Sequence, residues 1–212
     1  MEVFQVCPCK TIAVTGSDGK TTTTTIIAEL LKAAGQSVYV GGNIGKPLLP
    51  DVDGMVPEDV AVLELSSFQL MTMEQSPDIA VVTNLAPNHL DVHKSMEEYI
   101  TAKENIFTHQ GADGLLVLNQ DNEITRGFAV SARGRVTRFS RREELEQGVF
   151  VRDGPSGCAT PCTSARCSTW KTSSCPASTT SRITWRPSAP WTGWCPTRWR
   201  DFAAKFAGRA PH

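Results

Sequence analysis

A glycine-rich turn lies between an apolar run and a helical segment near the start of the chain. The turn reads Thr15-Gly-Ser-Asp-Gly-Lys-Thr21. The run before it, Thr11-Ile-Ala-Val14, predicts a buried strand, and Thr22 to Ala34 has apolar residues at helical spacing. A strand, a tight turn and a helix in this order direct backbone N–H groups and the positive end of the helix dipole toward one small volume. The turn therefore predicts a phosphate-binding loop.

The residue types in this loop favour a nucleoside triphosphate with Mg²⁺. Lys20 can reach the terminal phosphates, and the Thr21 hydroxyl can ligate the metal ion. The common phosphate loop would have a glycine at position 14, where Val14 stands, so the shorter pattern Gly-x-x-Gly-Lys-Thr stands here, and its chance occurrence is the alternative. Five β-branched residues, Thr21 to Thr25, begin a helix poorly, which favours a function for their hydroxyls. The expected nucleotide-binding residues are Gly16, Ser17, Asp18, Gly19, Lys20, Thr21 and Thr22.

The rest of residues 1–154 alternates apolar runs with helical segments. Ser95 to Phe107 predicts a helix that begins with a capping box, Ser95-x-x-Glu98. Continuous apolar runs are typical of strands buried on both faces, so we expect an α/β fold whose mostly parallel sheet has helices on both faces. Such sheets bind ligands beyond the carboxyl ends of their strands. The further strands are expected at 37–40, 60–65, 79–83 and 115–118, with shorter ones at 136–139 and 149–151.

Two charged residues lie where the predicted fold would bury them. Glu64 lies within an apolar strand, where its carboxylate needs an ion pair, a hydrogen bond or a metal ion. Lys103 shares the inward face of its helix with Tyr99, Ile106 and Phe107. A buried lysine is costly unless it is paired or chemically altered, and the alternative is that its stem extends along that face to solvent. Both residues are therefore candidates for a site.

Charge and hydropathy exclude several classes of function. Residues 1–154 contain 13 Lys/Arg and 21 Asp/Glu, a net charge of −8, which argues against a nucleic-acid-binding surface. No apolar run is long enough to cross a bilayer, and the N-terminus lacks the apolar core of a signal peptide. We expect a cytoplasmic protein without membrane insertion, and a monomer. Cys7-Pro8-Cys9 has one residue too few for the usual redox motif, so a plain linker is expected there.

Residues 155–199 have an abnormal composition. They contain all five tryptophans but no Leu, Val, Met, Phe, Asp or Glu, so they cannot form an ordinary core. A disulfide-rich module and a zinc site are alternatives, but the number of cysteines is odd and no histidine accompanies them. We favour a reading-frame error, which translation of the source DNA in its other two frames would test; residues 200–212 again predict a short helix. The cysteines of this segment are Cys158, Cys162, Cys167, Cys175 and Cys195.

Five ordered motifs resemble those of the Mur ligases, the ATP-dependent amide-forming enzymes of peptidoglycan precursor synthesis. The resemblance covers about residues 1–154 and implies a P-loop NTPase-like central ATP-binding domain. It is most similar to the family member that adds D-glutamate to UDP-N-acetylmuramoyl-L-alanine through an acyl phosphate. The motifs are Thr15-Gly-Ser-Asp-Gly-Lys-Thr-Thr-Thr-Thr24, Gly41-Gly-Asn-Ile-Gly45, Glu64-Leu-Ser-Ser-Phe-Gln-Leu70, Asn84-Leu-Ala-Pro-Asn-His-Leu-Asp91 and Tyr99-Ile-Thr-Ala-Lys103.

The resemblance implies roles for the matching residues. Lys20, Lys103 and His89 would be the catalytic residues, with Lys20 on the β- and γ-phosphates. Thr21, Glu64, His89 and Lys103 would hold Mg²⁺, Lys103 as a carbamate.

Weaker roles follow for residues at other strand ends. Asn43 and Ser66 would lie near the phosphates and the substrate, and Asn119 and Asp121 near the adenosine end of ATP. Asn88 departs from the family pattern, where many relatives have an acid before the histidine.

The resemblance also implies domains that residues 1–154 do not supply. The family has an N-terminal domain for the UDP moiety and a C-terminal ligase domain for the amino acid. We therefore expect an isolated central domain with weak nucleotide binding and no ligation by itself. The alternatives are another Mur ligase, a folylpolyglutamate synthase, which shares the phosphate loop, or a non-catalytic nucleotide-binding module.

Overall fold

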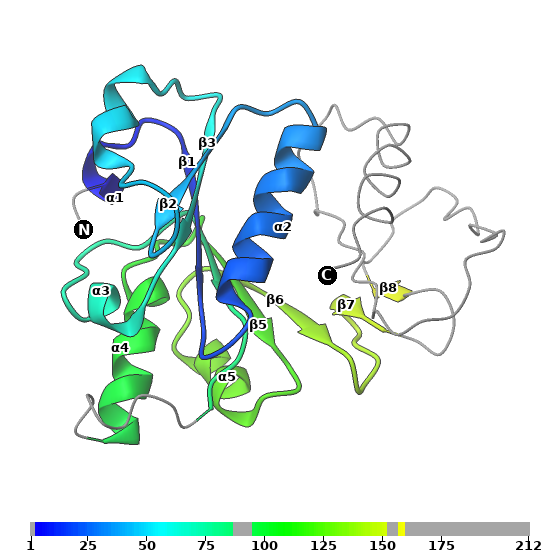
Figure 1. The fold of residues 1–212 in the computed structure, drawn as a ribbon. Coiled ribbons are helices and arrows are strands. Elements are labelled where there is room, and N and C mark those ends of the chain that lie inside the picture. The colour runs from blue at the N-terminus through cyan, green and yellow to red at the C-terminus, as the bar shows by residue number, and fades with distance from the viewer. Residues whose placement is uncertain (1–2, 87–94, 152–156, 160–212) are drawn as a thin grey trace, which may run out of the picture.

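The computed structural model describes residues 3–86, 95–151 and 157–159, which form one eight-stranded sheet with flanking helices (Figure 1). The strand order is β2-β3-β1-β4-β5-β6-β7-β8. All neighbouring pairs are parallel except β7 and β8, so the predicted mostly parallel α/β sheet is confirmed. The strands are β1 (Lys10–Thr15), β2 (Val38–Gly42), β3 (Val60–Glu64), β4 (Ile79–Val82), β5 (Leu115–Asn119), β6 (Arg135–Ser140), β7 (Gly148–Phe150) and β8 (Gly157–Ala159).

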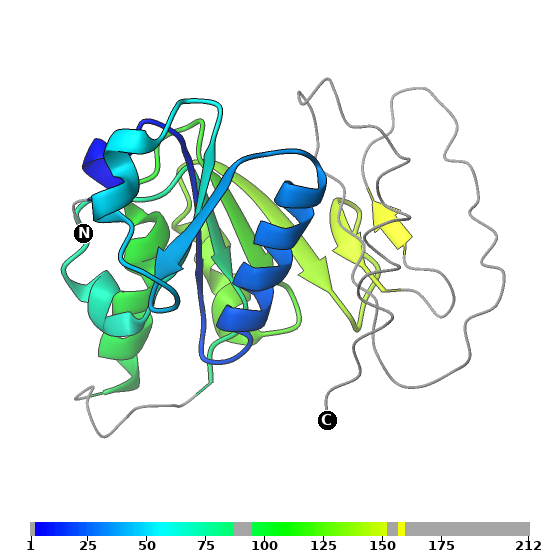
Figure 2. The same cartoon turned by 45° about the horizontal axis from the view of Figure 1, so that its top comes forward.

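Helices cover both faces of the sheet, as predicted. The long helix α2 packs on one face, and α3 and α4 pack together on the other (Figure 2). None of the helices in the described ranges is long and apolar enough to cross a membrane. The helices are α1 (Val3–Val6), α2 (Lys20–Ala33), α3 (Ser67–Met71), α4 (Met96–Thr108) and α5 (Glu123–Gly127), with the 3-10 turns η1 (Leu49–Gly54) and η2 (Phe128–Val130).

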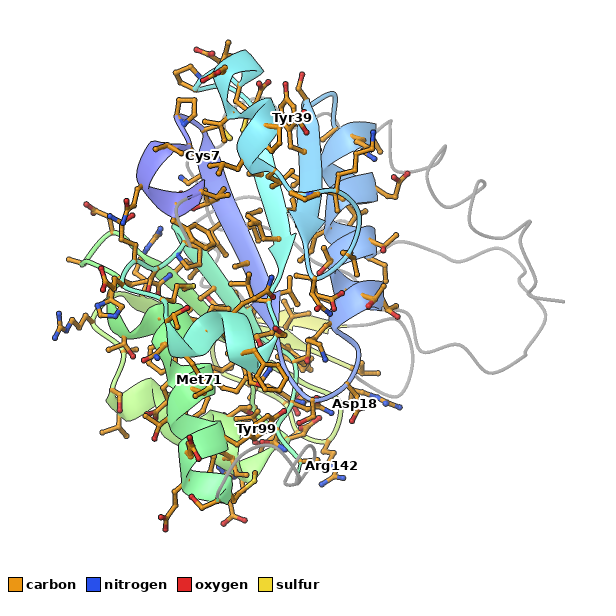
Figure 3. All side chains as sticks on the ribbon, turned by 60° about the vertical axis from the view of Figure 1, so that its left-hand side comes forward. Cys7, Asp18, Tyr39, Met71, Tyr99 and Arg142 are labelled. Carbon is orange, nitrogen blue, oxygen red and sulfur yellow. The ribbon has the colours of Figure 1, made fainter. Side chains whose placement is uncertain are left out.

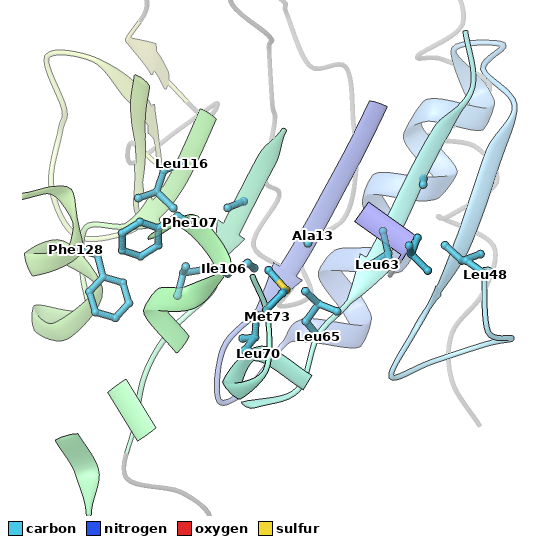
Figure 4. Packing of buried hydrophobic residues seen from close by; sticks show 14 of the residues in the cluster. Ala13, Leu48, Leu63, Leu65, Leu70, Met73, Ile106, Phe107, Leu116 and Phe128 are labelled. Atoms are coloured by element: carbon cyan, nitrogen blue, oxygen red, sulfur yellow. The ribbon is translucent and has the colours of Figure 1, made fainter. Parts of the chain in front are cut away.

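Alternate residues of each central strand enter two separate cores. Ala13 and Leu63 face α3 and α4, where they join Leu70, Ile106 and other large side chains (Figure 4). The intervening residues of the same strands face α2 instead, in a smaller cluster of mainly valines. Side chains alternate across a strand, so a sheet covered on both faces needs apolar residues at every position. The apolar runs of the sequence are continuous because both faces of these strands are buried.

The strand β1 lies inside the sheet, between β3 and β4. Its carboxyl end therefore lies beside the ends of both neighbours. Gly19 precedes α2 with φ +75°, and the helix begins at Lys20, two residues earlier than the predicted start. Ser95 caps α4 by accepting a hydrogen bond from the Glu98 N–H at 3.2 Å. The phosphate loop, which follows β1, therefore lies at the carboxyl end of the sheet, where we expect ligands to bind.

Some predictions lie outside the described residues. His89 and Asn88 belong to this group, as do the predicted helix at 200–212 and nearly all of the Trp-rich segment 155–199. Within that segment the structure describes β8, which pairs antiparallel with β7.

Candidate functional site

The phosphate loop is held in shape by residues that follow β4. The Ser17 N–H donates to the Asn84 carbonyl oxygen at 2.9 Å, and the Asp18 N–H donates to Asn84 Oδ1 at 2.9 Å. Thr83 Oγ1 donates to the Asp18 carbonyl oxygen at 2.7 Å. Because Gly16 has φ +149° and a Cβ there would overlap Thr83 Oγ1, only glycine fits between the two strands. The loop conformation therefore depends on Thr83, which the sequence reasoning did not single out.

Lys20 lies in the first turn of α2 and folds back over the loop. Its Nζ donates to the Ser17 carbonyl oxygen at 2.9 Å. The ammonium group thus lies on the loop itself, where a terminal phosphate would be bound by the backbone N–H groups. This position agrees with the role that the motif predicts for Lys20.

Glu64, at the end of β3, lies beside the loop. Only 2% of the residue is exposed, and neutral donors bind both carboxylate oxygens. Thr21 Oγ1 donates to Glu64 Oε2 at 2.7 Å, and Asn43 Nδ2 donates to Oε1 at 3.0 Å. The Asn43 N–H also donates to the Glu64 carbonyl oxygen at 2.7 Å. Of the predicted ways to satisfy this carboxylate, the hydrogen-bonded one is confirmed.

The same three side chains fit a divalent cation. Carboxylate, hydroxyl and amide oxygens are the ligands that Mg²⁺ takes, with one or two carboxylates supplemented by phosphates and water. Three acidic, His or Cys side chains do not gather into a metal site anywhere in the described ranges. A Mg²⁺ ion would therefore rely on Thr21 and Glu64 together with oxygens from a bound phosphate.

Lys103 is buried beneath the loop, and its predicted inward placement is confirmed. Its Nζ donates to Thr15 Oγ1 at 2.9 Å and to the Gly16 carbonyl oxygen at 3.3 Å, and 2% of the residue is exposed. The alternative that its stem extends to solvent is therefore wrong. Burial, and after it the charge of Lys20, lower the pKa of Lys103 from 10.5 to about 7, against the opposing effect of Glu64. A large fraction of the Lys103 side chains is therefore neutral near pH 7.

Tyr99 connects α4 to the loop from the same side as Lys103. Its hydroxyl lies 3.0 Å from Ser17 Oγ, and the Lys103 ammonium lies 5.4 Å from the centre of its ring. Burial raises the pKa of Tyr99. Figure 3 shows Tyr99 and Asp18 on neighbouring parts of this end of the sheet. The helix α4 therefore positions two polar groups against the loop.

The weaker candidates have mainly structural partners. Ser66 caps α3 in a capping box with Gln69. Asn119 Nδ2 donates to the Thr83 carbonyl oxygen at 2.8 Å, so Asn119 supports the residue that shapes the loop. Asp121 accepts hydrogen bonds from Ser140 Oγ and from the Arg141 N–H, at the end of β6. Their roles toward substrate and adenosine stay predictions.

The threonines of α2 do not all face the loop. Thr25 Oγ1 donates to the Thr21 carbonyl oxygen at 2.8 Å, one turn back in the helix. Thr24 is fully buried, and its hydroxyl has no hydrogen-bond partner among the described residues. The functional interpretation of the run therefore applies to Thr21, whose hydroxyl reaches Glu64.

Comparisons with known proteins identify this arrangement. A family model described as the Mur ligase middle domain matches residues 14–168. The chain belongs to the Mur ligase family. This Mur ligase chain is 59% identical over 154 residues to the UDP-N-acetylmuramoylalanine–D-glutamate ligase of Acetivibrio thermocellus, covering 72% of the chain and 33% of the relative. The protein of the same name from Clostridium beijerinckii is 58% identical over 145 residues, covering 68% of the chain and 32% of the relative.

A solved Mur ligase structure has the same fold. That protein is a UDP-N-acetylmuramoyl-L-alanyl-D-glutamate–2,6-diaminopimelate ligase, which superposes with a TM-score of 0.58 at 27% identity. The match covers 71% of the chain and 36% of that structure. The chain thus spans about a third of the length of the curated relatives that it matches.

Proposed function

We propose that this Mur ligase chain is the ATP-binding part of a ligase that adds D-glutamate to UDP-N-acetylmuramoyl-L-alanine. The observation that carries the proposal is the convergence of the phosphate loop, Glu64 and Lys103 at the carboxyl end of β1. The names of the two relatives favour D-glutamate as the amino acid over the substrates of other Mur ligases or of a folylpolyglutamate synthase.

The residues of the site would divide the work of phosphoryl transfer. The backbone N–H groups at the start of α2 and the Lys20 ammonium would bind the β- and γ-phosphates. Thr21 and Glu64 would hold Mg²⁺, which neutralises phosphate charge when bound. His89, a further proposed metal ligand, lies outside the described residues. The substrate carboxylate would attack the γ-phosphate and displace ADP to form an acyl phosphate, and the amino group of D-glutamate would then displace phosphate to leave an amide.

Carbamylation of Lys103 is part of this proposal. A pKa near 7 leaves much of the amine neutral, and a neutral amine can add to carbon dioxide with loss of one proton. The product is an anion in place of a buried cation, close enough to Glu64 to feel its charge. An anion there would supply oxygen ligands for a second Mg²⁺ ion.

The first prediction concerns nucleotide affinity. Lys20→Met is expected to weaken binding of MgADP to the chain by about a hundredfold or more. The variant loses the ammonium group that folds over the loop, where the phosphates would bind. Isothermal titration calorimetry measures the affinity. Lys32→Met is the matched control, since Lys32 lies at the far end of α2 in an exposed pair with Glu29. Equal affinities of the two variants would contradict the proposed role of the loop.

A second prediction concerns the metal ion. Glu64→Gln keeps the shape of the side chain but removes its charge, so the gain in ADP affinity on adding Mg²⁺ should fall roughly tenfold or more. The measurement is a pair of ADP titrations, with Mg²⁺ and with a chelator. Gln69→Glu is the control, because it changes a charge in the capping box of α3 and leaves the carboxylate of Glu64 in place. Circular dichroism checks that both variants fold. If Glu64→Gln kept the full effect of Mg²⁺, Glu64 would not be a metal ligand.

The choice of amino acid needs the longer protein. Residues 14–151 can replace the matching part of the Acetivibrio thermocellus relative, and release of phosphate can be measured with D-glutamate, L-glutamate or diaminopimelate. D-Glutamate-dependent turnover that is lost in a Lys20→Met version of the same chimaera supports the proposal. Nucleotide binding without turnover would favour the alternative of a non-catalytic module.

A further inference from the structure

Three sulfur atoms gather at the end of the sheet opposite to the phosphate loop. Cys7 and Cys9 precede β1, and Met55 follows η1. The two thiol sulfurs are 3.3 Å apart, and the Met55 Sδ lies 3.7 Å from Cys7 Sγ and 3.9 Å from Cys9 Sγ. The predicted plain linker at 7–9 is therefore packed against the body of the domain. Figure 3 shows Cys7 at the far end of the molecule from Asp18.

The spacing of the sulfurs fits a three-coordinate metal ion. For a metal–sulfur bond of about 2.3 Å, the sulfurs of a trigonal site are about 4 Å apart. Both distances to Met55 are within a few tenths of an ångström of that value. The two thiols need to separate by roughly half an ångström or more, which rotation of the partly exposed Cys7 side chain allows.

The ligand types select a soft, singly charged cation. Thiolates and thioethers favour Cu(I), whereas Zn²⁺ takes four ligands in structural sites and rarely a thioether. Asp59 supports a cation here, because its negative charge is close enough to act on the Cys9 thiol. Cys9 and Met55 are each 6% exposed, so the sulfurs are shielded from water, while Cys7 is accessible enough to admit an ion.

A disulfide between Cys7 and Cys9 would not involve the Met55 sulfur, whereas a metal ion would use all three sulfur atoms.

We infer that Cys7, Cys9 and Met55 form a binding site for Cu(I) that is separate from the nucleotide site. The Cu(I) ion forms bonds to two thiolates and one thioether. Each thiol releases its proton to solvent when it ligates, and no atom changes its oxidation state.

The experiment titrates the chain with Cu(I) under anaerobic conditions against a chromogenic Cu(I) chelator. The five cysteines of 155–199 are first replaced by serine in every protein compared, so that they do not compete. We expect one Cu(I) per chain. Cys7→Ser should lower the affinity by more than the roughly 10- to 100-fold that loss of an outer-sphere partner costs. Met55→Leu should lower it by about tenfold, and X-ray absorption should then show two sulfur neighbours of copper in place of three.

Met73→Leu is the matched control, because Met73 is buried in the core like Met55, whereas the sulfur contacts of the two thiols in the described structure are with each other and with Met55. Its affinity should equal that of the parent, and thermal unfolding checks that both Met variants fold. Cys7→Ser is used in place of Cys9→Ser, because Cys9 is buried and its replacement could prevent folding. The inference is overturned if the parent binds Cu(I) no more tightly than Cys7→Ser, or if Met55→Leu keeps the parent affinity. It is also overturned if the two thiols form a disulfide and no copper is bound.

Discussion

Gly16→Ala is expected to abolish nucleotide binding and to lower the free energy of unfolding by about 2–4 kcal/mol. At φ +149° an L side chain is strained, and the new Cβ would overlap Thr83 Oγ1 and lie 3.0 Å from the Asn84 carbonyl oxygen. Both groups hold the phosphate loop in shape, so the loop cannot move away without losing its hydrogen bonds. Urea unfolding and MgADP titration measure the two effects.

Two further variants separate steric overlap from a general effect of alanine. Gly54→Ala adds a Cβ where nothing lies within 4 Å and φ is unremarkable, so it should leave both measurements nearly unchanged. Gly16→Ala combined with Thr83→Ala removes the overlap but not the strained φ, so stability should recover only in part. If Gly16→Ala were as stable as Gly54→Ala, the close approach of Gly16 to Thr83 would be wrong.

Lys103→Met is expected to remove a rise in stability with pH. Between pH 7 and about 10.5, the unfolded chain keeps a proton on Lys103 that the folded chain has lost, because burial and Lys20 lower the folded pKa to about 7. The free energy of unfolding therefore increases with pH across this window, by roughly 3–5 kcal/mol in total, and is level below it. Methionine has no proton to lose, so the variant should lack this increase.

The measurement is the difference between the two proteins in urea unfolding at several values of pH. Buffers freed of carbon dioxide keep Lys103 an amine. Near pH 7 the variant avoids the cost of the buried charge but leaves Thr15 Oγ1 and the Gly16 carbonyl oxygen without their donor, which offsets part of the gain. Lys32→Met is the control, since Lys32 is exposed and its replacement should leave the pH dependence intact. An unchanged slope in Lys103→Met would contradict the burial of a neutral amine.

Much of the fold follows from local sequence patterns. Each continuous apolar run became a strand, and Lys103 was predicted to face inward because Tyr99, Ile106 and Phe107 recur at helical spacing around it. The loop was found because glycine and lysine have a fixed spacing between a strand and a helix. These features depend on residues that are neighbours along the chain.

The partners of the site could not be predicted in the same way. Asn43 reaches Glu64 because β2 lies beside β3, and Thr83 touches Gly16 because β4 lies beside β1. Strand order decides both contacts, and periodicity does not reveal strand order. Asp121, which is expected near adenosine, also accepts hydrogen bonds from Ser140 at the end of β6 and from Arg141 after it, a pairing that sequence spacing does not indicate.

The interior position of β1, between β3 and β4, has a consequence for how the chain becomes functional during synthesis. The phosphate loop lies at residues 15–21, yet its shape depends on Asn84 and Thr83, more than 60 positions later, and Lys103 contacts it across 88 positions. A nascent chain therefore emerges with the whole motif but without the scaffold that holds it. We expect nucleotide affinity to arise only after α4 has left the ribosome, because until then the motif lacks the distant residues that hold its shape.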